Sequence, residues 1–479
     1  LVNAKIVEEI NFMRKVVVDG SNTSGFQRTG LIATGGIIEY DGKILELDQL
    51  CLEEDSCRHG EEDHEYLLDR LGVPLLEITT KPQLDDSKDV QKAAKAIGRL
   101  LRACNVKRGL GTIRQDVNVS VNNGQRVELK GFQDLASMPK VVENEVKRQS
   151  RLYQMKEGKI GQPINVDNCF KKKREFSLAL KIENWNGILG NKDSPEGHVR
   201  MGRELADYAK RAGLKGIMHS DELPAYGIDI EETENIKLSL GCNDNDAFIL
   251  IFGKEKITKS AMEIIVERIN TKGVPKEVRK VTPKNLTRYL RPMPGASRMY
   301  PETDIAPFKI ANLKVRKPKT LDEREKDLPL NDEESKQLVN NELDKQFNIL
   351  NKKFDLPKLL SRILLHTLPQ LKNEGEAISD SDLEKVLILF QKGVIVKEGI
   401  PKALVQSSRN EEIQVNSDNV EVELEDFIES LVSDKKDFIK EKGMGAVGAL
   451  MGPVMSKFRG KMDGGDINKV LMEKVKEIL

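Results

Sequence analysis

Acidic side chains lie inside short apolar runs at several points between residues 51 and 130. The runs are Cys-Leu-Glu-Glu-Asp at 51–55, Val-Pro-Leu-Leu-Glu-Ile at 73–78, Thr-Ile-Arg-Gln-Asp-Val-Asn-Val at 112–119 and Val-Glu-Leu-Lys at 127–130. A carboxylate among such residues is costly to bury unless a metal ion, an Arg or a Lys meets it. Carboxylate oxygens suit Mg²⁺, which usually bridges to phosphates. The alternative to a metal site is that these acids lie at strand ends and are solvated. The candidate ligands are Glu54, Glu77, Asp116 and Glu128.

The register of one predicted hairpin gathers charged side chains on one face. If residues 122–124 form a three-residue loop with Gly124 left-handed, Asp116 faces Lys130 and Asn118 faces Glu128. A two-residue Asn-Gly turn would instead place charges opposite valines. The three-residue loop therefore predicts a single polar face made of Arg114, Asp116, Asn118, Glu128 and Lys130.

A Gly/Ser/Thr-rich segment at residues 19–29 is a second candidate site. Backbone amides and hydroxyl groups in such a loop can hold a phosphate or an acyl-adenylate-like anion, and a solvated turn is the alternative. The segment has neither the Walker nor the Rossmann glycine spacing. Its candidate ligand-binding residues are Ser21, Thr23 and Arg28.

Composition indicates several soluble domains. The chain has 479 residues, 38% of them hydrophobic and 32% charged, and no apolar run reaches the roughly 18 residues of a membrane helix. Its five scattered cysteines favour reduced thiols in a cytoplasmic protein over a disulfide framework. The zero net charge argues neither for nor against a nucleic-acid partner. The single Trp185 is expected to anchor a core or an interface.

Periodicity predicts the elements that must position these residues. A turn at 40–43 predicts a β-hairpin over 31–50, and helical spacing predicts an amphipathic helix over 89–104. Residues 175–285 alternate strands and helices and read as a separate α+β domain.

Charged helices are expected after the prolines near residue 300. An acidic linker at 411–430 then precedes a small basic helical module. This module could follow phosphates, although a solvated charged face is the alternative. Its candidate contacts are Lys435, Lys436, Lys440, Lys442, Lys457, Arg459 and Lys461.

Taken together, the four acidic runs resemble the GatB/GatE family of tRNA-dependent amidotransferase subunits, because their order and spacing are specific where any one run is not. Residues 19–29, Arg-Met-Tyr-Pro-Glu-Thr-Asp at 298–304 and the tail Gly-Met-Gly-Ala-Val-Gly at 443–448 extend the resemblance over almost the whole chain. The insertion at 175–285 is similar to a domain of bacterial-type aspartyl-tRNA synthetases, which points to the archaeal E-type branch.

The resemblance implies a ligase that uses ATP and Mg²⁺. Such a subunit phosphorylates the glutamate esterified to tRNA(Gln), and ammonia from an asparaginase-like partner, GatD, then displaces the phosphate. The family also implies a cytoplasmic heterotetramer of two D and two E subunits, with no membrane association.

The resemblance assigns roles to individual residues. Glu54 and Glu77 match acidic positions of the metal site and are the catalytic candidates, with Asp116 and Glu128 as further ligands. Phosphate charge would be neutralised by Arg114 and Lys130, and ATP or the aminoacyl end would be held by Ser21, Thr23 and Arg28. The tail resembles the YqeY-like module that binds tRNA.

The fold expected from the resemblance combines α/β and α+β domains. A mixed-sheet, cradle-like catalytic domain would occupy 1–170 and resume at 291–320, with an aspartyl-tRNA-synthetase-like insertion at 171–290. An all-helical region would follow, with a helical domain at 321–415 and the YqeY-like tail at 416–479. The family's first strand, which carries an active-site His and Glu, is expected before Leu1, and residues are expected to be absent near 58–60 and 170–171.

Two other functions compete with this interpretation. An aspartyl-tRNA synthetase would require class II motifs, which the sequence lacks. A non-catalytic tRNA-binding scaffold would use the carboxylates only in ion pairs with Arg114, Arg126 and Lys130; labelled ATP with Glu-tRNA(Gln) would distinguish the two.

Overall fold

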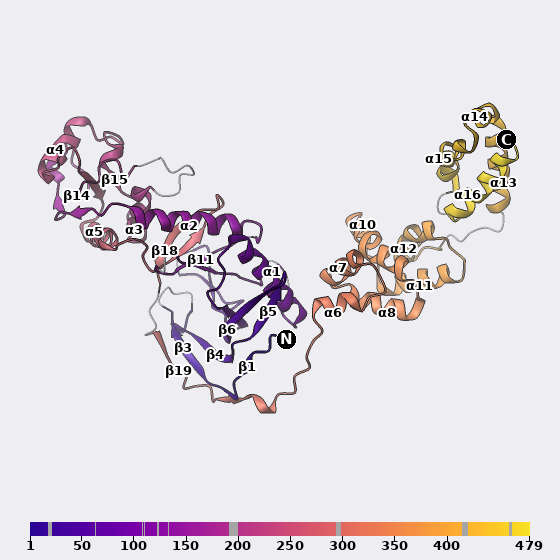
Figure 1. Ribbon diagram of the computed structural model, residues 1–479, viewed down its shortest axis with the longest axis horizontal. Helices are drawn as coiled ribbons and strands as arrows, with labels where there is room; N and C mark the ends of the chain where they lie inside the picture. The colour runs from indigo at the N-terminus through magenta and orange to yellow at the C-terminus, as the bar shows by residue number, and fades with distance from the viewer. Residues whose placement is uncertain are drawn as a thin grey trace. The chain divides into compact units, whose positions relative to one another are not determined.

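A computed structural model gives the fold and describes residues 1–17, 22–62, 64–107, 109, 111–121, 124–132, 134–190, 200–293, 298–413, 420–458 and 462–479. The chain divides into two compact units, Leu1–Pro318 and Lys319–Leu479. The first unit is mixed α/β and the described part of the second is helical (Figure 1). Among the described residues, no helix is both long and apolar enough to cross a membrane.

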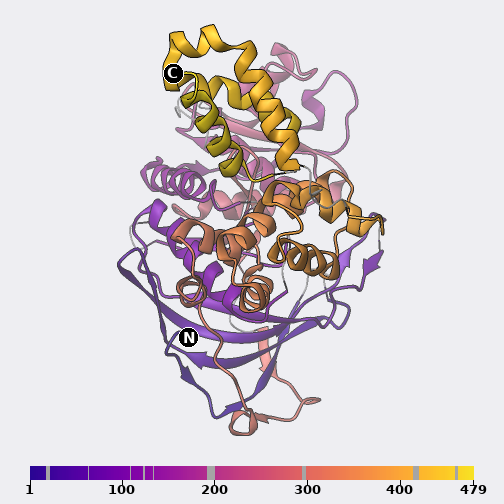
Figure 2. The same ribbon diagram turned by 90° about the vertical axis from the view of Figure 1, so that its right-hand side faces the viewer.

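A seven-stranded sheet forms the base of the first unit, and its strands are strongly curved in Figure 2. The order is β19-β3-β4-β6-β5, with β1 on β4 and β9 on β6. The strands are β1 (Lys5–Ile6), β3 (Phe12–Val16), β4 (Phe26–Thr34), β5 (Ile37–Tyr40), β6 (Lys43–Glu54), β9 (Pro74–Thr80) and β19 (Met299–Pro301).

The predicted hairpin around residue 41 is confirmed. Tyr40 pairs with Lys43, and both turn residues, Asp41 (φ 49°) and Gly42 (φ 73°), are left-handed, as a two-residue turn between twisted strands requires. Helix α1 (Ser87–Ala103) matches the predicted helix and packs Ala93 into the core of this hairpin.

A four-stranded sheet, in the order β10-β11-β17-β18, carries the predicted charged face. In the pair β10 (Val117–Val119) and β11 (Val127–Lys130), Asn118 faces Glu128, so the predicted register is confirmed. Gly124 is not left-handed, contrary to the prediction; its N–H donates to the carbonyl of Val121 at 2.8 Å. Residues 122–123 lie outside the described part of the chain.

The other two strands of this sheet come from much later in the sequence. β17 (Glu277–Val281) runs parallel to β11, and β18 (Thr287–Pro292) follows it as a hairpin. Helix α2 (Met138–Gln154) packs Val141 and Val142 against the apolar side of the sheet (Figure 1). β17 lies inside the predicted insertion, yet it shares one sheet and one core with β11, which precedes the insertion.

A five-stranded sheet contains most of the predicted insertion, and its elements match the predicted pattern. The strands are β12 (Lys159–Ile160), β13 (Ile164–Asn165), β14 (Ser177–Glu183), β15 (Met218–His219) and β16 (Ala247–Phe252), and the helices are α3 (Met201–Arg211), α4 (Ile230–Leu240) and α5 (Glu255–Asn270). Trp185 is 2% exposed in the core, as predicted. Short strand pairs complete the unit, namely β2 (Glu9–Ile10) with β20 (Phe308–Lys309) and β7 (Arg58–His59) with β8 (Tyr66–Leu67).

The second unit consists of short helices. Residues 319–413 contain α6 (Leu321–Lys326), α7 (Asp332–Asn340), α8 (Asp344–Phe354), α9 (Pro357–Arg362), α10 (Leu368–Asn373), α11 (Asp380–Gln391) and α12 (Ile400–Ser408). The last helices are α13 (Val420–Asp434), α14 (Lys436–Lys442), α15 (Ala446–Phe458) and α16 (Gly464–Lys476).

The prediction of an acidic linker at 411–430 is wrong from residue 420 onward. Helix α13 buries Leu424, Ile428 and Val432 in the same core as α15 and α16. The spacing of four residues places these side chains on one helix face, so the acids cover only the outer face.

Candidate active site

Charged residues gather on both faces of the seven-stranded sheet. Cys51 pairs with Glu77 across β6 and β9, and Glu53, two residues along β6, shares their face. Glu54 must point to the opposite face, because successive side chains alternate along a strand. The structure therefore separates Glu54 from Glu77 and does not assemble the predicted ligand set.

The first group of residues, here the arginine cluster, surrounds one carboxylate. It consists of Arg14, Arg28, Glu54, Glu302 and Asp304. The Glu302 side chain is fully inaccessible and accepts from Arg14 Nη2 and Arg28 Nε, each at 2.6 Å. The backbone N–H groups of residues 303 and 304 donate to the same carboxylate at 2.8 and 2.7 Å.

Glu54 lies at the edge of the arginine cluster. Its carboxylate accepts from the backbone N–H of Arg28 at 3.2 Å and from Arg28 Nη1 at 3.3 Å. Both guanidinium groups lie over the ring of Phe26, at 4.5 Å for Arg14 and 5.1 Å for Arg28. The cluster is thus an ordered ion-pair network with an aromatic support.

Hydrogen bonding fixes the charge states in this cluster. The bond from Arg14 holds the pKa of Glu302 far below its usual range, and the same bond raises the pKa of Arg14. Glu302 is therefore a permanent anion that positions two arginines, and Arg28 in turn contacts Glu54.

The second group of residues, here the lysine cluster, joins the two sheets. It consists of Lys15, Glu53, Glu77, Asp116, Glu128 and Lys130. Lys15 Nζ lies 2.9 Å from Glu53 on the seven-stranded sheet. On the four-stranded sheet, Lys130 Nζ contacts Glu128 at 2.6 Å and also pairs with Asp116.

Glu77 lies within electrostatic reach of both halves of the lysine cluster. Although the residue as a whole is exposed, its neighbours partly desolvate the carboxylate; this desolvation, and then the charge of Glu53, raise the pKa of Glu77 against the opposing effect of Lys15 and Lys130. Burial disfavours the charge of Lys130, but Asp116 and Glu128 raise its pKa overall. Two lysines, Lys15 and Lys130, and two carboxylates, Glu53 and Asp116, thus act electrostatically on Glu77 from two sheets.

The remaining predicted residues lie elsewhere. Arg114 Nη2 donates at 3.0 Å to Asp55, a 4% exposed carboxylate that Arg70 also contacts at 3.0 Å. Arg114 therefore neutralises a structural acid, and the predicted single face that included it is not formed as a whole.

The predicted phosphate loop is in part a strand. Arg28 belongs to β4 and pairs with Arg14 of β3, because the chain turns back at residues 22–25 and resumes a strand at Phe26. Thr23 is exposed in that turn, and Ser21 lies outside the described residues.

Arg14, Lys15, Glu53 and Glu302 receive no role from the sequence alone. Residues 298–304 stand out there only as a family-like motif, although this motif supplies the central carboxylate of the arginine cluster. The sequence signal that could have identified two sites is the pair of adjacent cations, Arg14 and Lys15, on a short strand. Because side chains alternate along a strand, one of the two must lie on each face of the sheet.

The donor set of the lysine cluster fits magnesium better than the predicted set does. Glu53 and Glu77 share a face, and the charge of Glu53 raises the pKa of Glu77, which is the repulsion that a divalent cation relieves. Magnesium often takes one or two carboxylates and completes its shell with phosphates and water. Within the described part of the chain, no three His, Cys, Asp or Glu side chains come together as a metal site.

The predicted tRNA-binding lysines lie on the tail. Lys435, Lys436, Lys440 and Lys442 are exposed in or beside α14. Lys457 lies over the ring of Phe427, with Nζ 4.2 Å from its centroid, and so also has a packing role. Arg459 and Lys461 lie outside the described residues.

Comparison with known sequences matches the chain to two family profiles. The GatB/GatE catalytic domain matches residues 1–316, and the GatB domain matches residues 345–475. Similar proteins include one from Archaeoglobus fulgidus, 39% identical over all of this chain and 82% of its own length. Others are from Methanocaldococcus jannaschii (39%, all of this chain, 83% of its own length) and Thermococcus gammatolerans (38%, with the same shares). All three are named as the E-type subunit of glutamyl-tRNA(Gln) amidotransferase.

Proposed function

The chain belongs to the family of the GatB/GatE catalytic domain, and from this premise we propose that it converts Glu-tRNA(Gln) to Gln-tRNA(Gln). The similar archaeal proteins bear the name of that amidotransferase. The observation that carries the proposal is the lysine cluster, where cations and carboxylates of two sheets converge around Glu77.

The proposed reaction has two steps. A γ-carboxylate oxygen of the tRNA-bound glutamate attacks the γ-phosphorus of ATP, forming an acyl phosphate and releasing ADP. Ammonia then attacks the carbonyl carbon of the acyl phosphate, which is Cδ of the glutamate; the bond from this carbon to the phosphate oxygen breaks, phosphate leaves, and the nitrogen loses a proton to become the amide. Phosphoryl transfer depends mainly on positioning and on neutralising phosphate charge.

The lysine cluster supplies these requirements from the chain's own residues. Lys15 and Lys130 are the cations placed to neutralise phosphate oxygens; Lys130 is one of the two predicted cations, and Lys15 takes the place of the other, Arg114, which pairs with Asp55. Glu53 and Glu77 would hold Mg²⁺, which when bound offsets the phosphate charge. Glu54 and Arg28, on the other face, would position this sheet through the arginine cluster.

The domain organisation is part of the proposal. We take residues 1–170 and 291–320 as a cradle-like catalytic domain, 171–290 as an insertion similar to that of aspartyl-tRNA synthetases, 321–415 as a helical domain and 416–479 as the YqeY-like tail. The curved seven-stranded sheet supports the first assignment, and the five-stranded sheet supports the insertion up to the end of α5, because β17 and β18 belong to the sheet of β10 and β11.

The tail is the proposed tRNA-binding module. Its α14 lysines are exposed, and α15 exposes Gly448 and Gly452 with open space where a side chain would lie. Lysines next to glycine backbone allow the sugar-phosphate backbone of an RNA to approach the helix closely. The asparaginase-like GatD, a heterotetramer of two D and two E subunits, and a cytoplasmic location complete the proposal.

The test measures whether Glu77 is needed for ATP cleavage. Full-length protein with its asparaginase-like partner receives Glu-tRNA(Gln), Mg²⁺ and labelled ATP, and ADP formation is measured. Glu77→Gln is expected to lower ATP cleavage by about a hundredfold or more, because it removes a carboxylate that would hold the Mg²⁺ needed to offset the phosphate charge. Glu39→Gln, an exposed glutamate of β5, is the matched control and should cleave ATP normally.

One observation favours the scaffold alternative. Lys130 is already paired with Asp116 and Glu128, as a purely structural role would require. In a scaffold, Glu77→Gln would leave ATP cleavage equal to that of Glu39→Gln, and this result would refute the catalytic assignment.

A further inference from the structure

A cavity of about 340 Å³ lies outside the two clusters described above, between helix α3 and the turn that joins β17 to β18. Of the residues that the structure describes, five with cationic side chains and two with acidic ones line it. The cations are Arg200, Arg203, Arg279, Lys284 and Arg288, and the acids are Glu204 and Asp207. Such an excess of positive charge around a hollow raises the question of which cations are already neutralised.

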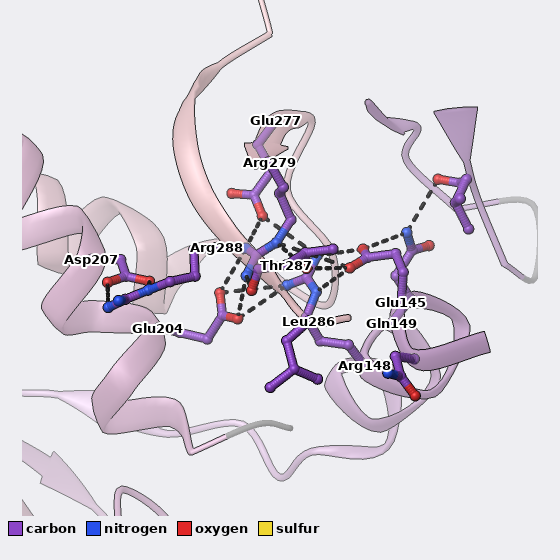
Figure 3. A network of polar contacts seen from close by, with 12 residues as sticks. Glu145, Arg148, Gln149, Glu204, Asp207, Glu277, Arg279, Leu286, Thr287 and Arg288 are labelled. Atoms are coloured by element: carbon purple, nitrogen blue, oxygen red, sulfur yellow. Dashed lines mark hydrogen bonds and ion pairs between the residues drawn. The ribbon is translucent and has the colours of Figure 1, made fainter. Parts of the chain in front are cut away.

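One wall of the cavity belongs to a buried ion network (Figure 3). Arg279, 1% exposed, donates to both oxygens of Glu204 at 2.8 and 3.0 Å and to Glu277 at 2.6 Å. Its remaining N–H groups donate to the hydroxyl and carbonyl of Thr287 at 2.8 and 3.2 Å. Arg279 therefore has no donor left for a ligand, and its charge is matched inside the protein.

A second cation of the lining is also committed. Arg288 makes a two-pronged pair with Asp207, with Nε 3.0 Å from Oδ2 (Figure 3). Both acids of the cavity are therefore already paired with arginines of its wall, Glu204 with Arg279 and Asp207 with Arg288.

The other three cations have no such partner. Arg200, Arg203 and Lys284 are exposed, and their side chains form no ion pair or hydrogen bond with any residue that the structure describes. They come from two separate elements, since Arg200 and Arg203 begin α3 and Lys284 lies in the turn after β17. Three uncompensated charges thus face one hollow from two sides.

The turn that carries Lys284 is held firmly. Thr282 and Leu286 close it through a backbone bond of 2.8 Å. The side chain of Asn144, from α2, donates at 2.8 Å to the carbonyl of Asn285. The backbone position of Lys284 is therefore set by the fold before any ligand arrives, which lowers the entropic cost of binding.

We propose that this cavity binds the phosphate group of a phosphorylated ligand. Three unpaired cations suit an anion of more than one charge or two adjacent phosphates, and guanidinium groups match phosphate geometry. Within the described part of the chain, the cavity lining contains no aromatic residue on which a base could stack. The phosphate can come from an RNA backbone or from a small phosphorylated molecule.

The test uses full-length protein and two probes, pyrophosphate and an unmodified tRNA transcript. The variant is Arg203→Gln with Lys284→Gln, and Lys284→Gln alone is the second variant. Lys210→Gln is the matched control, because Lys210 is exposed on the same helix but does not line the cavity. Trp185 fluorescence during unfolding verifies that each variant is folded.

The outcomes distinguish the two phosphate sources. For an RNA backbone, the slope of log affinity for tRNA against log salt should fall by about two in the double variant and by about one in Lys284→Gln. For a small phosphorylated molecule, pyrophosphate affinity should fall at least tenfold while the tRNA slope stays constant. If both readouts in both variants equal those of Lys210→Gln, the site does not exist.

Discussion

Replacing Arg279 by Met tests whether the buried ion network holds the first unit together. Arg279 is the hub of four elements, since its partners Glu204, Glu277 and Thr287 come from α3, β17 and β18, and Arg148 of α2 shares the same carboxylates. Methionine has a similar length and can fill the space, but it donates no hydrogen bond. The change therefore isolates the loss of charge from the loss of volume.

The expected cost follows from what is left behind. Glu145, Glu204 and Glu277 are each at most 5% exposed, so Arg279→Met leaves three buried carboxylates that share Arg148. Removing one partner of a buried ion pair typically costs about 3–5 kcal/mol, because the remaining charge is uncompensated in a poorly polarisable interior. We expect a loss in this range for unfolding of the first unit.

The assay needs a signal that reports on this unit only. Trp185 is the single tryptophan, and it lies in the same hydrophobic core as Val141 of α2 and Leu205 of α3. Its fluorescence during urea unfolding therefore follows the first unit and excludes the second. Arg211→Met, at an exposed position of α3, is the matched control and should stay within about 0.5 kcal/mol of the unmodified chain.

A second substitution tests the mechanism itself. Adding Glu204→Leu to Arg279→Met removes one stranded carboxylate and should restore part of the lost stability. If Arg279→Met costs less than about 1 kcal/mol, or if the double variant is no more stable than the single one, the network does not stabilise this unit.

Two further predictions follow from the same structure. Burial alone would raise the pKa of Glu204, but Arg279 and Arg148 lower it from 4.5 to about 2. Because the pKa is lower in the folded state, the ionised Glu204 stabilises the fold above pH 4.5, and roughly 3 kcal/mol of unfolding free energy should be lost between pH 4.5 and 2. An unfolding free energy, followed by Trp185 fluorescence, that does not change over this pH range would contradict this prediction. Replacing Lys440 and Lys442 by Gln should raise the apparent KM for tRNA several-fold without changing that for ATP; equal changes would make the tail structural.

Local pattern was sufficient for much of the fold. The hairpin register that pairs Asn118 with Glu128 was predictable because alternation allows only one register with all charges on one face. Helices α1 and α4 and strand β16 were predictable from apolar period alone. What periodicity could not give was the parallel pairing of β11 with β17, since these strands are separated by a whole five-stranded sheet.

The candidate site was predictable in its residue types but not in its grouping. Glu54 and Glu77 both occupy acidic runs, yet the pairing of Cys51 with Glu77 places them on opposite faces. Sequence alone cannot supply that pairing, because it depends on which residue of β9 meets which residue of β6. Glu302 was beyond local reasoning for the same cause: its partners Arg14 and Arg28 precede it by more than 270 residues.

The adjacent acids Glu53 and Glu54 explain why one short run can serve both clusters. Alternation sends Glu53 to the lysine cluster and Glu54 to the arginine cluster, so a single strand end connects the two faces. Glu302 holds Arg28, Arg28 contacts Glu54, and the backbone that carries Glu54 also carries Glu53. The fixed anion at Glu302 therefore restrains the position of a carboxylate on the opposite face, which gives the distant motif at residues 298–304 a physical connection to the proposed chemistry.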